Sequence, residues 1–350
     1  MTPPAHPATD WRALHGDHFA GRRVLVTGGA GFIGSHLCEA LVALGAAVVA
    51  LDDLSGGHER NLAHLPAGDA PGRVSFVRGS ILDGAALAAA AAGCTYVLHQ
   101  AALGSVPRSV EIPRLYHDVN ATGTLNVLEA ARAAGTVRRV TFAASSSAYG
   151  EDPALPKVET MAPQPRSPYA ATKVAGEALC RAYAASYGLD TAPLRYFNIF
   201  GPRQSPDNAY AAVIAAFAKA LLAGRRPVIY GDGEQSRDFT FVHNAVHANL
   251  LACRHPGPVG GEPVNVACGQ RVTVNQLGAD MARLLGRPDL TPEYRPDRAG
   301  DVRHSLADLS RARAAIGYEP VVDFGPGLSA AVAWYRTALG ADAGRAPGHA

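Results

Sequence analysis

The hydrophobic positions of this chain fall into short apolar runs that alternate with longer amphipathic segments. Six runs have the length of strands: residues 24–26, 47–51, 74–77, 96–99, 139–144 and 191–195. Four segments between them have helical spacing: residues 35–44, 85–92, 120–134 and 169–187. Strands and helices that alternate in this way build a parallel sheet, whose ligands bind beyond the carboxyl ends of its strands. The pattern predicts a Rossmann-like, doubly wound α/β fold.

Beyond residue 198 the pattern loosens. We expect a loop over 200–208, a helix over 210–223 and a strand over 228–230, and an earlier loop over 100–109. These predict an NAD-binding domain over residues 21–200 and a smaller C-terminal α/β lobe over 201–339, mainly for the substrate. Residues 1–20 and 340–350 show no apolar period, and we expect them to be mobile tails.

The first strand leads into a turn with three glycines, Gly28, Gly31 and Gly34. The first allows a sharp turn, the second allows a phosphate to approach the backbone, and the third allows the helix to pack on the strand. The new helix then directs its N–H groups at a pyrophosphate. Such turns also occur in plain connections between a strand and a helix. Here, however, Asp52 stands at the tip of the second strand, where a carboxylate binds ribose hydroxyls and repels a 2′-phosphate. The sequence predicts NAD as cofactor.

Tyr169 and Lys173 stand four residues apart at the start of a predicted helix, so their side chains share a face. The pair alone occurs by chance in many helices and is then a surface pair. Here it follows the glycine turn, and the fifth strand ends in the serine run 145–147. We expect the Lys173 ammonium to lower the pKa of the Tyr169 phenol and to hold the nicotinamide ribose, while a serine hydroxyl orients the proton transfer.

Charge and cysteine content exclude several classes of protein. The 32 basic and 30 acidic residues leave no basic field for nucleic acid. Five scattered cysteines form no C-x-x-C pair, so we expect reduced thiols and no metal site. Because there is no run of twenty apolar residues and no signal-peptide pattern, we expect a cytoplasmic protein without a membrane partner.

Over residues 22–335 the sequence resembles the extended short-chain dehydrogenase/reductases, in particular the UDP-sugar C4-epimerases, and within them the branch acting on UDP-N-acetylglucosamine and UDP-N-acetylgalactosamine. The stretches that match are residues 98–109, 143–150, 167–173, 194–201, 209–213, 231–238 and 298–305. The resemblance implies NAD, a UDP-sugar and a homodimer formed through the helices that begin near Asn120 and Tyr169. Their apolar faces could equally belong to the core.

The resemblance also implies roles for individual residues. The catalytic set would be Ser145, Tyr169 and Lys173. The cofactor would contact Gly28, Gly31, Phe32, Ile33, Gly34, Asp52, Ser80, Ile81, Gln100, Ala101, Ala102, Asn120, Tyr169, Lys173 and Tyr196. The substrate would contact Gly104, Ser105, Ser145, Ser146, Tyr169, Asn198, Ala212, Val213, Val228, Tyr230, Arg237, Arg298, Asp301 and Ser305.

Within that substrate set, Asn198, Arg237 and Arg298 would bind the diphosphate. Tyr230 would stack on uracil, and Asp301 would bind the uridine ribose. Without the family, both arginines read as ordinary surface or salt-bridge residues.

Four positions refine this assignment. Ser80 stands where the family usually has the aspartate that meets adenine. Ser305 stands where enzymes restricted to glucose and galactose carry a bulky tyrosine, so there is room for an N-acetyl group beside C2. Dehydratases and decarboxylases place an acid after the catalytic hydroxyl, where this chain has Ser146 and Ser147.

These residues predict epimerisation at C4 through a transient 4-keto sugar, with Tyr169 as acid and base and NAD regenerated in each cycle. Three alternatives stay open: a UDP-glucuronate 4-epimerase, a net nucleotide-sugar dehydrogenase or reductase, and a non-catalytic NAD-binding sensor.

Overall fold

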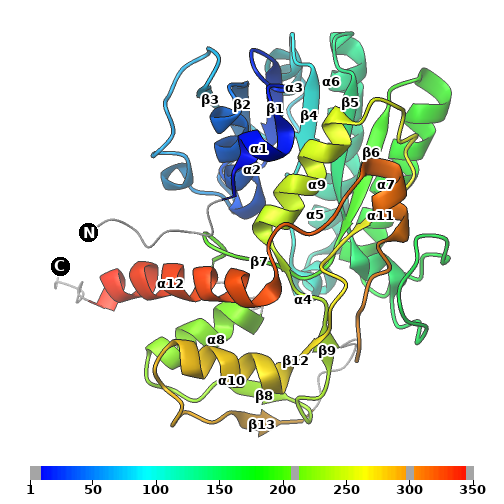
Figure 1. The fold of residues 1–350 in the computed structure, drawn as a ribbon. Coiled ribbons are helices and arrows are strands. Elements are labelled where there is room, and N and C mark those ends of the chain that lie inside the picture. The colour runs from blue at the N-terminus through cyan, green and yellow to red at the C-terminus, as the bar shows by residue number, and fades with distance from the viewer. Residues whose placement is uncertain (1–8, 206–212, 297–302, 344–350) are drawn as a thin grey trace.

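The computed structural model describes residues 9–205, 213–296 and 303–343. Its centre is a seven-stranded sheet in the order β11-β6-β5-β4-β1-β2-β3, in which every neighbouring pair is parallel. Its strands are β1 (Arg23–Thr27), β2 (Ala47–Asp52), β3 (Arg73–Arg78), β4 (Tyr96–His99), β5 (Arg139–Ser145), β6 (Thr191–Tyr196) and β11 (Val264–Val266). The central strands are buried along almost their whole length, as expected for a parallel sheet covered on both faces (Figure 1). The predicted fold class is confirmed.

Helices cover both faces of this sheet. The core that contains Val24 and Val48 packs against α2 (Phe32–Ala43) and α9 (Val242–Arg254). The core that contains Leu25 and Val49 packs against α3 (Gly84–Ala91), α6 (Gly123–Ala134) and α7 (Pro168–Tyr187). Because β1 pairs with β2 on one side and with β4 on the other, the strand order reverses at β1. Ligands of such sheets bind at this reversal, beyond the carboxyl ends of the strands.

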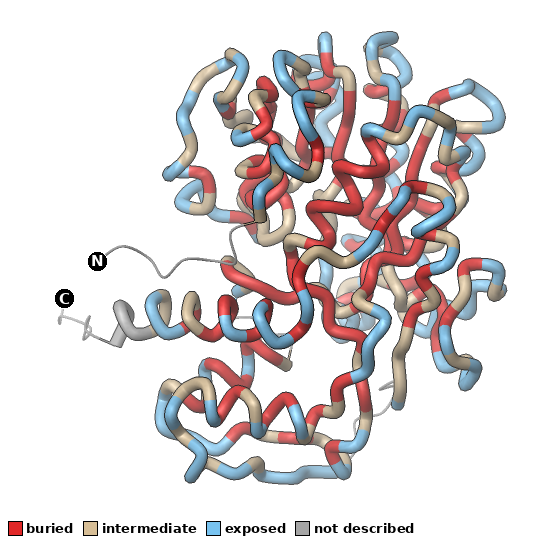
Figure 2. The backbone as a smooth tube through the Cα atoms, viewed as in Figure 1, coloured by how far each residue is buried: buried red, intermediate tan, exposed pale blue. Residues whose placement is uncertain are grey.

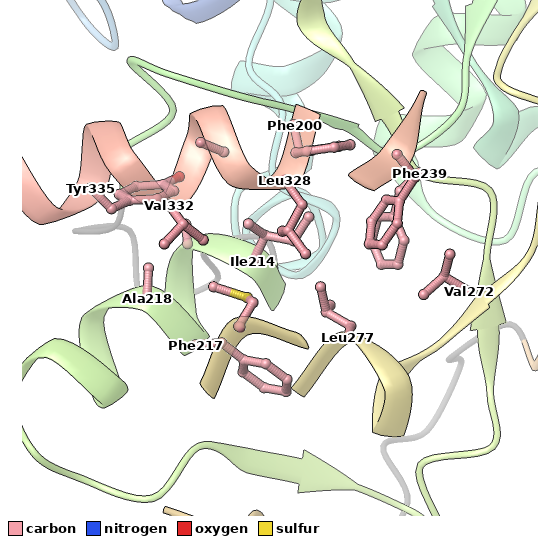
Figure 3. Packing of buried hydrophobic residues seen from close by; sticks show 14 of the residues in the cluster. Phe200, Ile214, Phe217, Ala218, Phe239, Val272, Leu277, Leu328, Val332 and Tyr335 are labelled. Carbon is pink, nitrogen blue, oxygen red and sulfur yellow. The ribbon is translucent and has the colours of Figure 1, made fainter. Parts of the chain in front are cut away.

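A smaller lobe lies below the sheet in Figure 1. Its helices are α8 (Val213–Leu222), α10 (Val274–Leu284) and α12 (Phe324–Ala343). Its strand pairs are β8 (Val228–Tyr230) with β13 (Glu293–Arg295), β9 (Ser236–Arg237) with β12 (Val272–Thr273), and β7 (Ile199–Phe200) with β10 (Thr240–Phe241). Buried Phe200, Phe217, Leu277, Leu328 and Tyr335 meet in its core (Figure 3).

The chain crosses between the two parts more than once. After β10 it returns to the sheet as α9 and β11, then forms α10 in the lobe, and returns again as α11 (Ser310–Ile316), which packs with β11 residues in one core. The division at residue 200 therefore needs a refinement, because residues 242–266 complete the large sheet. Val264–Val266 is too short an apolar run to be recognised as a strand until β6 is there to pair with it.

The structure differs from the predicted N-terminal tail. Residues 11–15 form α1 (Trp11–His15), and Phe19 is fully buried in the core with Val24 and Tyr96. Trp11 packs partly buried against the same core, and two aromatic side chains eight residues apart show no repeating period that would indicate their burial. At the other end, α12 continues to Ala343, and the remainder of the predicted C-terminal tail lies outside the described residues.

Two further stretches are more helical than predicted. Within the expected loop over residues 100–109, Ser105 caps α4 (Val106–Glu111) by accepting from Arg108 N, and α5 (Pro113–His117) follows. The helix expected from Asn120 begins as a π-helical turn, Asp118–Thr122, and becomes α6 at Gly123. Within the described residues, Glu59–Asn61 and Ser146–Tyr149 form 3-10 turns.

All five cysteines are free thiols and four of them are buried, as expected. Figure 2 shows that buried residues gather along the large sheet and the helices against it, whereas the outer loops are largely exposed. Within the described ranges, no three His, Cys, Asp or Glu side chains form a group that could hold a metal ion. No helix in that part of the chain is both long enough and apolar enough to cross a membrane.

Candidate active site

The glycine turn after β1 is packed so tightly that side chains would not fit. A Cβ at Gly34 would lie 2.0 Å from the carbonyl oxygen of Gly28, and one at Gly28 would lie 2.7 Å from the backbone nitrogen of Ala101. Gly28 also has a φ of +67°, which favours glycine. Gly31 caps α2 without a side-chain hydrogen bond, so the first N–H groups of the helix remain available to an anion. The turn fits a pyrophosphate.

Asp52 ends β2 beside this turn. Its carboxylate accepts from Ala30 N at 3.0 Å and from Leu54 N at 2.8 Å, while burial raises its pKa. A Cβ at Gly57 would lie 2.8 Å from the carboxylate, so Gly57 keeps the space beside it open. Each oxygen retains a lone pair for a ribose hydroxyl. The residues present fit an NAD dinucleotide.

The other predicted cofactor residues lie along the same edge and are held by the protein. Phe32 and Ile33 pack partly against the hydrophobic cores at the start of α2. Ser80 Oγ accepts from Leu82 N at 3.3 Å. Ile81 is buried against Gly123, where a Cβ would lie 2.5 Å from the Ile81 side chain. No pattern in the sequence pointed to this role of Gly123.

A hydrogen-bond network supports the loop after β4. The Tyr196 hydroxyl donates to Gln100 Oε1 at 3.1 Å and accepts from Asn249 Nδ2 at 2.6 Å, and burial raises the pKa of Tyr196 to about 12. Ala101 N donates to Thr27 Oγ1 at 3.3 Å, and Ala102 follows, partly exposed. Asn249 lies on α9, far away in the sequence, and only the fold shows its place here.

Asn120 fastens this loop to α7. Its side chain accepts from Leu103 N at 2.8 Å and donates to Leu103 O at 3.1 Å and to Thr172 Oγ1 at 3.2 Å. Next in the loop, Gly104 has open space around it, and Ser105 N donates to the Tyr116 hydroxyl at 3.2 Å. Asn120 therefore orients the segment that bears the predicted substrate contacts Gly104 and Ser105.

The predicted catalytic residues are brought together where β5 and α7 meet. Lys173 is buried, and its Nζ donates to Ala143 O at 2.8 Å and lies 5.9 Å from the centre of the Tyr169 ring. Ser145 forms a hydrogen bond with Tyr169 that lowers the pKa of the phenol. Ser145 Oγ also accepts from Ser147 Oγ at 2.8 Å, and Ser146 begins the adjoining 3-10 turn.

The pKa of the Tyr169 phenol is raised, whereas the sequence predicted that it would be lowered. Burial raises the pKa of Tyr169 above its usual value and outweighs the opposing hydrogen bond from Ser145. Burial also lowers the pKa of Lys173 to about 8, and the Glu177 carboxylate opposes that shift. Loss of solvent therefore dominates the pKa of both groups, and the hydrogen bond with Ser145 partly compensates for it at the phenol.

On the substrate side, Asn198 and Ser305 are in direct contact although they are far apart in the sequence. Asn198 has a φ of +40°, and its Nδ2 donates to Ser305 Oγ at 3.3 Å and to Asp238 O at 3.2 Å. Asp238 N donates to Ser305 Oγ at 3.4 Å. The Ser305 hydroxyl is thus a shared acceptor, which the sequence did not reveal.

Asp238 organises this region. Its fully buried carboxylate accepts from the backbone nitrogens of Cys268, Gly269 and Ala307 at 3.0 to 3.2 Å. Burial raises the pKa of Asp238 to about 6, against these hydrogen bonds. Asp238 lies within a stretch that matches the family, but the resemblance implies a role only for its neighbour Arg237.

The remaining predicted substrate residues lie around this network or outside it. Arg237 Nη1 donates to the backbone oxygens of Ser236 and Arg303 at 3.1 and 3.2 Å. Val228 and Tyr230 begin and end β8, both partly buried, and Val213 begins α8. Ala212, Arg298 and Asp301 lie outside the described residues.

Comparisons with known proteins agree with this geometry. A family model described as "NAD dependent epimerase/dehydratase family" matches residues 24–267. A UDP-glucose 4-epimerase of Mycolicibacterium smegmatis is 42% identical over 90% of this chain and 98% of its own length. A UDP-glucuronate 4-epimerase of Thermodesulfobacterium geofontis is 34% identical over 89% of this chain and 95% of its own length.

Among solved structures, this fold is similar to a UDP-N-acetylglucosamine 4-epimerase from Methanobrevibacter ruminantium in complex with UDP-N-acetylmuramic acid. The two share 39% sequence identity with a TM-score of 0.85, over 91% of this chain and 99% of the other.

Proposed function

This chain belongs to the NAD-dependent epimerase/dehydratase family, and from that premise we propose that it interconverts UDP-N-acetylglucosamine and UDP-N-acetylgalactosamine. UDP-sugar 4-epimerase activity is supported by relatives that cover almost the whole chain. NAD is the cofactor, as in the rest of the family. The choice of an N-acetylated sugar is the finer part of the proposal.

One observation carries the reaction: Tyr169, Ser145 and Lys173 meet at the carboxyl edge of the sheet, where β5 ends and α7 begins. Bound NAD would supply the hydride acceptor and donor for C4. Tyr169 takes the proton of the C4 hydroxyl, directly or through Ser145, and gives a proton back to the 4-keto sugar. Lys173 holds positive charge near the phenol and stabilises its phenolate form.

The residues of the smaller lobe would hold the UDP group while the sugar rotates. Asn198 and Arg237 would bind the diphosphate, with Arg298, and Asp301 would bind the uridine ribose, beside Tyr230 on uracil. Asn198 Nδ2 donates to Asp238 O and to Ser305 Oγ, so it would reach a diphosphate oxygen by exchanging one of these two bonds. A keto sugar that is held only through its diphosphate can rotate and turn either face of C4 toward the nicotinamide.

The small Ser305 side chain supports the N-acetylated substrate. Its hydroxyl contacts Asn198, so a residue at this position lies next to the proposed sugar site. Ser146 and Ser147 provide no acid for elimination, which favours epimerisation over dehydration. A UDP-glucuronate 4-epimerase is the second candidate, because a relative of this activity covers most of the chain.

The test is product analysis on UDP-N-acetylglucosamine, UDP-glucose and UDP-glucuronate with the full-length protein and with Tyr169→Phe. We expect the C4 epimer of the N-acetylated sugar as the main product and no lasting accumulation of NADH. Tyr169→Phe should keep NAD bound and lose about 10²- to 10⁴-fold in kcat. Faster turnover of the uronate would favour the second candidate, and near-normal Tyr169→Phe activity would refute the mechanism.

We also propose a homodimer. Val110, Leu115 and Leu125 are large apolar residues that are 63%, 45% and 37% exposed on α4, α5 and α6. They lie near the helices through which the resemblance implies dimerisation. Light scattering that shows only monomers would contradict this.

A further inference from the structure

A buried ion pair joins the helix that carries Tyr169 and Lys173 to strand β6. Arg195 Nε and Nη2 donate to the two oxygens of Glu177 at 2.8 and 2.7 Å, and the arginine and glutamate side chains are 2% and 8% exposed. Desolvating two charges is unfavourable, and a buried pair often stabilises a protein less than apolar residues of the same volume would. Stability alone therefore does not account for the pair.

The pair touches both elements of the catalytic centre. Glu177 lies one helical turn after Lys173, on the same face of α7. The guanidinium carbon of Arg195 lies 4.7 Å from the centre of the Tyr149 ring. Tyr149 ends the 3-10 turn that Ser145 caps, and its hydroxyl donates to Asn265 Oδ1 at 2.7 Å. The pair thus connects α7 to the serine turn.

The charged and titratable groups around Lys173 come from three elements. Tyr169 and Glu177 share α7 with it, His99 faces it from β4, and Arg195 lies behind Glu177 on β6. Burial lowers the pKa of His99 to about 3, so the imidazole is neutral. Glu177 supplies the negative charge in this set, and its carboxylate raises the pKa of Lys173 against the effect of burial.

We propose that Glu177 and Arg195 form a positioning pair, which keeps Lys173 cationic and fixes α7 against the turn that carries Ser145. The inference rests on the proposed function, in which a cationic Lys173 stabilises the Tyr169 phenolate. Neither member of the pair touches the sugar in this scheme. Arg195 orients the carboxylate through two parallel hydrogen bonds, and the carboxylate acts on Lys173 by its charge.

A titration that does not depend on activity tests the pair. The chain has three lysines, Lys157, Lys173 and Lys219, so NMR of protein labelled with carbon-13 at lysine Cε gives few signals, and Lys173→Arg assigns the relevant one. In Glu177→Gln we expect Lys173 to titrate about one pH unit lower than in the wild type. An unchanged Lys173 titration would overturn the proposal.

Two further variants keep the test decisive. If Glu177→Gln does not fold because Arg195 is left unpaired, Glu177→Gln with Arg195→Met removes both charges, and the Lys173 titration should still move down, by less. Asp190→Asn is the matched control, since it breaks the largely buried Arg139–Asp190 ion pair at the opposite end of β5 and β6. It should lower the melting temperature and leave the Lys173 titration unchanged.

The pH dependence of kcat completes the experiment. Turnover should fall on the alkaline side as Lys173 loses its proton, and Glu177→Gln should shift that limb to lower pH by the amount seen in the NMR titration. A limb that moves equally in Asp190→Asn would show a merely structural role. If the wild type shows no epimerase activity, the proposed function fails, and the NMR titration still decides the pair.

Discussion

Replacing Ser305 by alanine or by tyrosine separates two effects of this residue: its hydrogen bonds to Asn198 and Asp238, and the room it leaves beside C2 of the sugar. Its hydroxyl accepts from Asn198 Nδ2 at 3.3 Å and from Asp238 N at 3.4 Å. Ser305→Ala removes both hydrogen bonds and adds no volume. At about 0.5–1 kcal/mol for each of two long bonds, the expected loss is about 1–2 kcal/mol. This corresponds to about a 5- to 30-fold lower kcat/KM, shared by all UDP-sugars because Asn198 would serve their common diphosphate.

Ser305→Tyr adds a steric effect to that loss. A ring placed beside C2 of the sugar leaves no room for an N-acetyl group, and overfilled sites yield only at about 1–3 kcal/mol of strain. We therefore expect Ser305→Tyr to act on UDP-galactose about as well as Ser305→Ala does. Its activity on UDP-N-acetylgalactosamine should be lower by about another 10- to 100-fold.

The assay is the kcat/KM of wild type, Ser305→Ala and Ser305→Tyr on both substrates, with separation of the epimers by chromatography. The ratio of the two kcat/KM values isolates the steric effect, since the hydrogen-bond loss cancels in it. An unchanged ratio in Ser305→Tyr would refute the reasoning that Ser305 lies beside C2. A ratio that already changes in Ser305→Ala would show that Asn198 contacts the sugar itself.

Three further outcomes follow from the contacts described above. Gly34→Ala should abolish NAD binding, measured by calorimetry, because its Cβ would lie 2.0 Å from the carbonyl oxygen of Gly28, whereas Gly84→Ala, with open space around it, should bind NAD normally. Phe19→Ala should lower the free energy of unfolding by about 3–5 kcal/mol in urea titrations, since Phe19 is fully buried. The control Leu82→Ala, at 42% exposure, should change it by less than about 0.5 kcal/mol. An equally small effect of Phe19→Ala would contradict the burial of Phe19 and support a mobile N-terminal tail. For Asp238, burial raises the pKa to about 6, above that of an exposed aspartate, so the stabilising contribution is present below pH 4 and is lost as the pH rises through 6. The wild type should therefore gain stability relative to Asp238→Asn as the pH falls from 7 to 4, and the opposite slope would show that the hydrogen bonds to Asp238 outweigh its burial.

Local patterns in the sequence were enough to predict the fold class, the cofactor turn and the Tyr169–Lys173 pair. Each depends on residues that are close in the chain: glycine spacing within one turn, alternation of short apolar runs, and two side chains one helical turn apart. The chemistry of such features follows from the residues themselves. The family resemblance extended this to residues of the second lobe, whose predicted roles remain proposals.

Contacts between distant segments were decided only by the tertiary structure. The Asn198–Ser305 hydrogen bond, the Glu177–Arg195 pair, the burial of Phe19 and the pairing of β11 with β6 each join residues that no local pattern relates. The same is true of protonation, because the pKa of Tyr169 depends on how much water the packing of β5 and α7 removes. Sequence therefore determines which groups are present and where the chain turns, whereas burial and long-range hydrogen bonds, which set their charge and orientation, exist only once the chain has folded.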